Sequence, residues 1–346
     1  MQSILRTLME GRSLDEREAE RAFDLILRGE ANESQVGAML ALLARKRPSL
    51  DEIVGGARAM RARATAVPID GPDAPAIRAR LIDTCGTGGT AKTFNISTAA
   101  AVVAAAARGP NGERVYVAKH GGRSRSGRGS AEVLSLLGVN VDAAPETQTK
   151  CLREAGVCFS FAVNHHPAMK FAAGARKSLG FPTIFNVLGP LTNPAGARRQ
   201  VMGVYDRALV PLVAEAMARL GAEDALVVHG LDGMDEISTT GPTIAARVRD
   251  GRVAHEEISV ADLGMPAARI EDLVVDSVDR AADTIRGILA REAGAARDIV
   301  VVNAGAALMI GGVADNLRIA ADLAARAIDS GEASRTLEAL ARISRG

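Results

Sequence analysis

The chain has 346 residues, 47% of them hydrophobic, which is enough for one large or two ordinary domains with a substantial core. Its 42 basic residues nearly cancel its 41 acidic residues, which excludes a global field that would attract nucleic acid or a membrane surface. Any anion site must therefore be local. The first residues lack the apolar core of a signal peptide, and no run of about 20 apolar residues predicts a membrane span. We expect a cytoplasmic protein.

The three cysteines, Cys85, Cys151 and Cys158, are odd in number and show no CxxC spacing. This pattern argues against both a disulfide framework and a structural zinc site. Cys151 and Cys158 are interpreted as buried thiols in a reducing compartment.

The segment from Ser3 to about Val67 carries apolar residues at helical spacing. Capping residues followed by acids or glutamine predict helix starts within residues 13–18, 32–35 and 48–53. We expect a small all-helical domain over residues 1–70, made of about four short helices. Residues 71–75, Gly-Pro-Asp-Ala-Pro, are typical of the linker that follows.

Beyond this linker, short aliphatic segments alternate with alanine-rich stretches. Strands are predicted at residues 80–83, 115–118, 225–229 and 299–303. The alternation favours an α/β domain over residues 78–346, with a mostly parallel central sheet flanked by helices. Ligands of such sheets bind beyond the carboxyl ends of the strands, so the loops that follow the strands are the first place to look for chemistry.

The first such loop is glycine-rich and spans residues 84–98, Thr-Cys-Gly-Thr-Gly-Gly-Thr-Ala-Lys-Thr-Phe-Asn-Ile-Ser-Thr. Its glycines allow a close backbone approach, and the helix start that follows favours an anion, with hydroxyl donors at Ser97 and Thr98. The loop is interpreted as a phosphate cradle, although many such turns merely make a tight connection. Its spacing matches neither the Rossmann fingerprint nor the P-loop.

The second loop, residues 117–132, carries Lys119, Arg123, Arg125 and Arg128 among glycines and serines. Four cations on one loop suit a multiply charged anion such as a diphosphate, and the alternative is a solvated basic loop. His120 has no obvious carboxylate partner in the sequence, so it is assigned to binding rather than to acid–base chemistry.

The third loop, residues 228–237, places Asp235 beside Glu236. Adjacent carboxylates near a diphosphate suit Mg²⁺, which prefers one or two carboxylates together with water and phosphate oxygens. An isolated Asp-Glu pair is usually a solvated turn, and it is the two anion loops that favour the metal.

These three loops, with residues 161–170 (Phe-Ala-Val-Asn-His-His-Pro-Ala-Met-Lys) and 183–195 (Thr-Ile-Phe-Asn-Val-Leu-Gly-Pro-Leu-Thr-Asn-Pro-Ala), resemble the signature set of anthranilate phosphoribosyltransferases. The resemblance spans nearly the whole chain. It implies a small helical domain joined to an α/β domain, a fold shared with pyrimidine nucleoside phosphorylases. It also implies that part of residues 166–200 returns to the helical domain, and that the chain forms a homodimer through its helical part.

The resemblance also implies individual roles. It places phosphoribosyl diphosphate beside Gly86, Gly89, Thr90, Thr93, Asn95, Ile96, Ser97, Thr98, Lys119, His120, Gly121, Arg123, Ser126 and Ser130. It places anthranilate beside Gly86, Gly122, His166 and Arg176, and magnesium beside Ser97, Asp235 and Glu236. The residues that it implies to be catalytic are Lys119 and Arg176.

The implied reaction joins the phosphoribosyl group of 5-phosphoribosyl 1-diphosphate to the amine of anthranilate, with release of diphosphate, in tryptophan biosynthesis. Substitution at the anomeric carbon chiefly requires positioning and stabilisation of the departing charge. Mg²⁺ and Lys119 would neutralise the diphosphate, and the planar guanidinium of Arg176 suits a carboxylate. No strong general base is evident.

Three places depart from the family pattern. Thr90 replaces an aspartate, Gly122 replaces an asparagine, and Gly174 and Ala175 precede Arg176 where the family has Pro-Val or Pro-Thr. These departures leave open a phosphoribosyltransferase with another aromatic amine or heterocycle as acceptor, or a reaction like that of a nucleoside phosphorylase. A non-catalytic paralogue that binds nucleic acid is a further alternative, which the near-neutral charge and the Asp-Glu pair disfavour.

Overall fold

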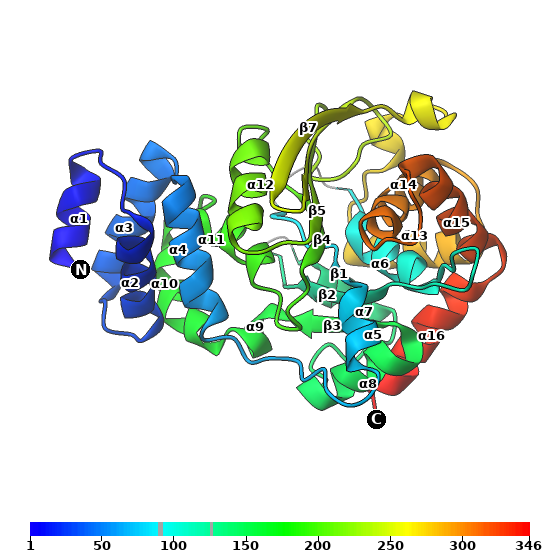
Figure 1. Cartoon of the computed structure of the whole chain (residues 1–346), viewed down its shortest axis with the longest axis horizontal. Helices are drawn as coiled ribbons and strands as arrows, with labels where there is room; N and C mark the ends of the chain where they lie inside the picture. The colour runs from blue at the N-terminus through cyan, green and yellow to red at the C-terminus, as the bar shows by residue number, and fades with distance from the viewer. Residues whose placement is uncertain (89–92, 125–126) are drawn as a thin grey trace.

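The computed structural model describes residues 1–88, 93–124 and 127–346. It has two regions: N-terminal helices lie at one end, and a larger α/β region lies at the other (Figure 1). In the part of the chain that the structure describes, no helix is long and apolar enough to cross a membrane.

The helical region comprises α1 (Gln2–Met9), α2 (Glu16–Leu27), α3 (Glu33–Lys46) and α4 (Leu50–Arg61). Helices α2, α3 and α4 begin with capping boxes at Asp15, Asn32 and Ser49, whose side chains accept the backbone N–H three residues on. These boxes satisfy backbone donors that a helix start would leave unpaired. They confirm the three predicted helix starts.

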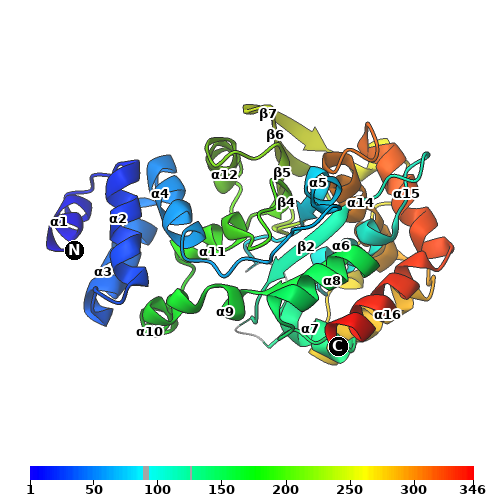
Figure 2. The same ribbon diagram turned by 60° about the horizontal axis from the view of Figure 1, so that its bottom comes forward.

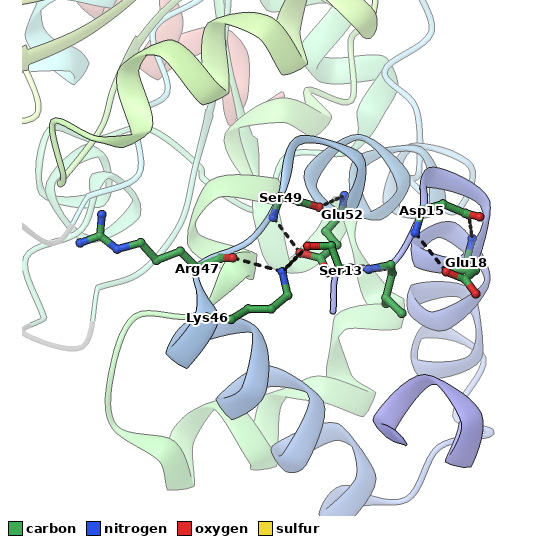
Figure 3. A network of polar contacts seen from close by, with 8 residues as sticks. Ser13, Asp15, Glu18, Lys46, Arg47, Ser49 and Glu52 are labelled. Carbon is green, nitrogen blue, oxygen red and sulfur yellow. Dashed lines mark hydrogen bonds and ion pairs between the residues drawn. The ribbon is translucent and has the colours of Figure 1, made fainter. Parts of the chain in front are cut away.

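A buried ion pair joins the end of α3 to the start of α4 (Figure 3). Glu52 is fully buried, and one of its carboxylate oxygens lies 2.7 Å from Lys46 Nζ and accepts the Ser49 N–H at 2.7 Å. Its other oxygen accepts the backbone N–H of Leu14, which precedes α2, at 3.0 Å. One carboxylate therefore fixes three segments of the helical region.

The central sheet has seven strands in the order β3-β2-β1-β4-β5-β6-β7. They are β1 (Leu81–Asp83), β2 (Tyr116–Gly121), β3 (Val157–Phe161), β4 (Arg199–Gly203), β5 (Asp224–Gly230), β6 (Thr243–Arg249) and β7 (Arg252–Ile258). Strands β1 to β5 pair in parallel, and β6 and β7 form an antiparallel hairpin at one edge. The mostly parallel sheet and three of its predicted strands are confirmed.

Twelve further α-helices are described outside the helical region. They are α5 (Ala74–Ala79), α6 (Ile96–Ala106), α7 (Ser130–Leu136), α8 (Pro145–Ala155), α9 (Ala162–His165), α10 (Lys170–Leu179), α11 (Ile184–Leu188), α12 (Leu209–Arg219), α13 (Val278–Leu289), α14 (Ala295–Ile310), α15 (Leu317–Asp329) and α16 (Glu332–Ser344). Figure 2 shows α9, α10 and α11 along the side of the sheet that faces the helical region.

Two hydrophobic cores meet in the sheet, because neighbouring strand residues point to opposite faces. In β5, Leu226 and Val228 join the core built around α6 and α14. Ala225 and Val227 join the other core, which contains α12, α10, α11 and helices α2 to α4. The helical region is therefore packed continuously onto one face of the sheet.

The prediction of a strand at residues 299–303 is wrong, because these residues lie within helix α14. Every residue from Ile299 to Ile310 is buried, with the sheet, α6 and α15 packed around the helix. An apolar run that is buried on all sides has no exposed face to reveal its period. Strands β3, β4, β6 and β7 were not predicted.

Replacing Glu52 with alanine should destabilise the protein by about 3–5 kcal/mol, because the change leaves the Lys46 ammonium without its carboxylate in a largely buried place. Chemical denaturation should report this loss as a lower midpoint. The control is Glu10→Ala, which removes an exposed ion pair with Arg12 and should cost less than about 1 kcal/mol. Equal effects of the two substitutions would contradict the role given to Glu52.

Candidate active site

A pocket opens where the carboxyl ends of β1, β4 and β5 meet. Its lining comes from the loop after β1, the start of α6, the end of β4, the loop after β5, and α14. The lining residues are Thr84, Gly86, Ser97, Ala100, Val201, Gly203, Asp235, Glu236 and Asn303. The first and third predicted loops therefore meet at one place, as expected for strand ends at one edge of a parallel sheet.

Two glycines allow these strand ends to approach each other. A Cβ atom on Gly203 would overlap the backbone carbonyl of Asp235, and one on Gly86 would lie 2.8 Å from the Gly203 carbonyl oxygen. A side chain at either position would push the loops apart. The spacing of the pocket is thus set by backbone contact.

Asn303 of α14 holds the loop that carries the carboxylates of Asp235 and Glu236. The Asn303 side chain accepts the backbone N–H of Ile237 at 3.0 Å and donates to the Ile237 carbonyl at 2.9 Å. Asn303 is itself buried. Sequence reasoning missed this residue, because it assigned Asn303 to a strand.

Glu236 and Lys119 lie on either side of Ser97, at the start of α6. The Ser97 backbone N–H donates to Glu236 at 3.1 Å, and Lys119 Nζ lies 3.3 Å from the Ser97 hydroxyl. Lys119 Nζ also lies 3.4 Å from the Thr84 carbonyl oxygen and 3.5 Å from its hydroxyl. The structure therefore brings Lys119 of β2, Ser97 of α6 and Glu236 of the loop after β5 together.

The electrostatics of the pocket favour added positive charge near the carboxylates. Burial, and then repulsion from Asp235, raises the pKa of Glu236 to about 8, while Lys119 and the Ser97 hydrogen bonds act in the opposite direction. Two adjacent carboxylates, one of them poorly ionised near pH 7 because it is buried, form a set that suits a hard divalent cation.

Asp83, at the end of β1, is a second residue that sequence reasoning missed. It is fully buried and accepts the backbone N–H of His120 at 3.1 Å and the side-chain amide of Asn193 at 2.7 Å. Burial raises its pKa to about 6, opposed chiefly by the charge of Lys119. Asn193 also donates to the Ala118 carbonyl at 2.7 Å, so it joins β1 to β2. The signal available in the sequence was an aspartate at the end of a predicted aliphatic strand.

His120 and His166 pack against each other, with ring centroids 5.1 Å apart. Both are buried, and burial lowers the pKa of each imidazole, to about 4 for His166. Both rings are therefore neutral near pH 7. His166 Nε2 lies 3.3 Å from the Thr192 hydroxyl.

Gly122 and Arg176 come from different parts of the molecule. Among the described residues, a Cβ atom on Gly122 would meet only Ala162 Cβ, at 3.8 Å, so they leave room for a side chain at this position. Arg176 lies on α10, on the side of the helical region, with its guanidinium 5.4 Å from the ring centre of Phe185.

The basic loop after β2 contacts its neighbours through side chains, most of which bind backbone carbonyls. Asn95 donates to the Arg128 carbonyl at 3.1 Å, and the Arg128 guanidinium donates to the Val275 carbonyl. Arg123 lies over the Phe161 ring, 5.6 Å from its centre. Ser130 is the first residue of α7 and donates to the Gly122 carbonyl at 3.4 Å.

Residues 78–334 match the family described as the glycosyl transferase family, a/b domain, and residues 2–64 match its helical bundle domain. The anthranilate phosphoribosyltransferase of Rubrobacter xylanophilus is 45% identical over 348 aligned residues, which cover 100% of this chain and 98% of that protein. The chain belongs to the anthranilate phosphoribosyltransferase family.

Solved structures of this family share the fold. The crystal structure of the enzyme from Thermus thermophilus has a TM-score of 0.89 and 36% identity, and the match covers 99% of both chains. A Saccharomyces cerevisiae enzyme in complex with PRPP and Mg has a TM-score of 0.87 at 23% identity, covering 99% of this chain and 97% of that one.

In this family member the candidate site residues fall into three groups. Gly86, Ser97, Asp235 and Glu236 line the pocket, with Lys119 beside Ser97. Thr93 and Asn95 precede α6, whose Ile96 and Thr98 have buried side chains. Gly121 ends β2, Arg123 follows it and Ser130 begins α7. Gly89, Thr90, Arg125 and Ser126 lie outside the described residues.

Replacing Gly203 with alanine should lower activity by about 100-fold, because a shift of about 1 Å in the carboxylate loop is enough to misplace reacting groups. Steady-state kinetics would measure the loss. Gly37→Ala is the matched control, since an added Cβ meets nothing within 4 Å on helix α3 and should leave activity unchanged. Full activity in Gly203→Ala would show that the strand ends tolerate separation.

Proposed function

We propose that this protein transfers the phosphoribosyl group of 5-phosphoribosyl 1-diphosphate to the amine of anthranilate, giving N-(5-phosphoribosyl)anthranilate and diphosphate in tryptophan biosynthesis. The observation that carries this proposal is the environment of Lys119. Its side chain is buried, and its ammonium lies among neutral oxygens at 3.3 to 3.5 Å. No carboxylate of the described residues lies within ion-pair distance of it.

A buried ammonium that makes no close ion pair is costly, and an incoming anion lowers that cost. The position of Lys119 beside Ser97, at the start of α6, adds the free N–H groups and the dipole of a helix N-terminus. Both features favour a phosphorylated donor. Asn95, Thr93 and the loop that ends at Ser130 would enclose the rest of it.

Asp235 and Glu236 would hold Mg²⁺, with Ser97 beside them. Their fit rests on two adjacent carboxylates that line one pocket with Ser97, where burial and then repulsion from Asp235 raise the pKa of Glu236. When bound, the metal supplies charge neutralisation to the departing diphosphate. The protein groups would fix the place where the diphosphate charge develops. Lys119 would face the diphosphate as a preformed cation, and the close backbone contacts at Gly86 and Gly203 would set the distance between the diphosphate and the carboxylates.

The acceptor would bind on the other side of Lys119, against the His120–His166 pair and Gly122. Neutral, buried imidazoles present a flat and weakly polar surface to an aromatic ring. Arg176 would pair with the carboxylate of anthranilate, for which a guanidinium is well shaped. The amine would then attack the anomeric carbon as the diphosphate leaves, and its proton would pass to water or to diphosphate.

We also infer that the chain divides into a helical domain over residues 1–70, joined by part of residues 166–200, and an α/β domain over residues 78–346. The shared core of α2 to α4 with α10 and α11 supports this division. A homodimer through the helical part is supported by the exposed side chains of Met9, Phe171 and Phe181. Three buried free thiols fit a reducing compartment such as the cytoplasm.

The protein mixed with 5-phosphoribosyl 1-diphosphate, Mg²⁺ and anthranilate should consume anthranilate, followed as a loss of its fluorescence, and a chelator should stop the reaction. Release of diphosphate with another amine, but none with anthranilate, would overturn the acceptor and retain the donor. Glu236→Gln should shift the Mg²⁺ titration to higher concentration. An unchanged titration in this variant would reject the metal assignment.

Replacing Arg176 with alanine should raise the KM for anthranilate at least about 10-fold, because a charge-assisted pair contributes about 1.5–3 kcal/mol. The KM for the phosphoribosyl donor should change little. Initial rates at varied concentrations of each substrate would separate the two constants. Lys177→Ala, on the exposed side of the same helix, is the control. Equal increases in both KM values would remove Arg176 from the acceptor site.

A further inference from the structure

Three side chains at the ends of β1 and β2 carry metal-binding atoms that converge. The ligand atoms of Asp83, Cys85 and His120 all lie within 4.8 Å of one another. Asp83 ends β1, Cys85 follows it by two residues, and His120 lies on the neighbouring strand β2. Because β1 and β2 pair in parallel, this convergence is fixed by the sheet. The three residues belong to β1, the loop after it and β2, whereas Asp235 and Glu236 belong to the loop between β5 and β6.

We propose that Asp83, Cys85 and His120 form a binding site for a borderline-soft divalent cation such as Zn²⁺, and that its occupation inhibits the enzyme. The site differs from the magnesium carboxylates in both its residues and its chemistry. One carboxylate, one thiolate and one imidazole are a ligand set suited to zinc or cobalt, whereas Mg²⁺ requires oxygen ligands.

His120 provides the strongest indication that the cluster can accept a ligand. Its side chain is 2% exposed, yet neither ring nitrogen makes a hydrogen bond with any described residue. A buried imidazole normally pairs both nitrogens, so an unpaired ring nitrogen is costly. The backbone of Gly189 lies near one ring nitrogen without the geometry of a formed hydrogen bond, which leaves the other nitrogen for a cation.

Asp83 keeps capacity for a cation although it already accepts two hydrogen bonds. An ionised carboxylate offers about four lone-pair sites. The hydrogen bonds from the backbone N–H of His120 and from the side-chain amide of Asn193 use two of them. These bonds would also orient the carboxylate, as partners of metal ligands usually do. Cys85 is free and buried, with its sulfur 3.7 Å from the Gly86 carbonyl oxygen as a weak contact.

The separation of the three atoms requires only a small contraction. Zinc bonds of about 2.0–2.3 Å in a tetrahedron place neighbouring ligand atoms about 3.3–3.8 Å apart. Separations of up to 4.8 Å therefore need to shorten by about 1.5 Å at most, so each of two atoms moves by less than about 1 Å. A water molecule would complete the coordination, and the thiol proton would leave to solvent when the cation binds.

Inhibition follows from the neighbours of the three ligands. Cys85 lies between Thr84 and Gly86, which both line the pocket, and His120 is adjacent to Lys119. A contraction of about 1 Å around the cation would draw the loop after β1 and the end of strand β2 toward each other. It would also place positive charge near the Lys119 ammonium. This charge would change the position of the buried cation on which donor binding is proposed to depend.

The test uses the full chain in excess Mg²⁺ and without substrates, with Co²⁺ as the spectroscopic probe for the zinc position. Wild-type protein should bind one equivalent of Co²⁺ and develop a thiolate-to-cobalt absorption band in the near ultraviolet, which added Zn²⁺ removes. This measurement involves no catalysis, so it can fail or succeed independently of the proposed function. The absence of a thiolate band in the wild-type protein would overturn the proposal.

Cys85→Ala and the matched control Cys158→Ala, another buried free cysteine, separate this site from other metal sites. Cys85→Ala should lack the band and require at least 10-fold more Zn²⁺ for half-inhibition, while Cys158→Ala should behave as the wild type. A chelator should restore activity in wild-type protein. Zinc inhibition of equal strength in wild type and Cys85→Ala, or a band that persists in Cys85→Ala, would place the metal elsewhere.

Discussion

The active site depends on a close backbone contact between the ends of three parallel strands. Gly203, at the end of β4, lies against the Asp235 carbonyl from the loop after β5, and Gly86, after β1, lies against Gly203. Only glycine permits both contacts. Because β1 and β4 are neighbours, and β4 and β5 are neighbours, the glycine-rich loop after β1 and the loop that carries Asp235 and Glu236 come from strands that are two positions apart. The glycines remove the gap that side chains would otherwise fill, and so bring Ser97 within hydrogen-bonding distance of Glu236.

This closeness has an electrostatic consequence. Asp83 and Glu236 both have raised pKa values, for each mainly through burial, and Lys119 is the cation that opposes both shifts. Lys119 is nevertheless not within ion-pair distance of a described carboxylate, so its charge is shared among several acidic groups rather than committed to one. An anionic donor and a cation that entered such a site together would offset each other's charge, which would link the binding of the two.

Much of this arrangement could be predicted from the sequence. Glycine-rich and basic loops after short aliphatic strands indicated an anion site, and parallel strands required those loops to lie at one edge. The order of the strands in the sheet could not be predicted. Strands β3 and β4 carry no clear alternation of apolar and polar residues, and no strand was predicted in the segment after Glu236, where β6 and β7 lie. Asn303 was missed for a related reason: α14 is buried on all sides, so its apolar run has no period to reveal a helix. Asp83 and Asn193 act only through contacts between distant segments, which a single sequence does not show.

The acceptor side depends on the link between the two regions. The segment that leaves α4 is fixed at Thr65, whose N–H donates to the His165 carbonyl at 2.8 Å and whose carbonyl oxygen lies 2.6 Å from His165 Nδ1. His165 Nε2 in turn contacts Gln148 of α8 at 2.9 Å, so this imidazole joins the inter-region segment to the α/β region.

The next residue, His166, packs against His120. The histidine that faces the proposed acceptor is therefore positioned by the same short segment that sets the placement of the helical region. Arg176 is carried by α10, which packs in the core of that region. The distance between Arg176 and the His120–His166 pair is consequently a property of how the two regions are joined, and a substitution at the Thr65–His165 contact would act on the acceptor through position rather than through direct contact.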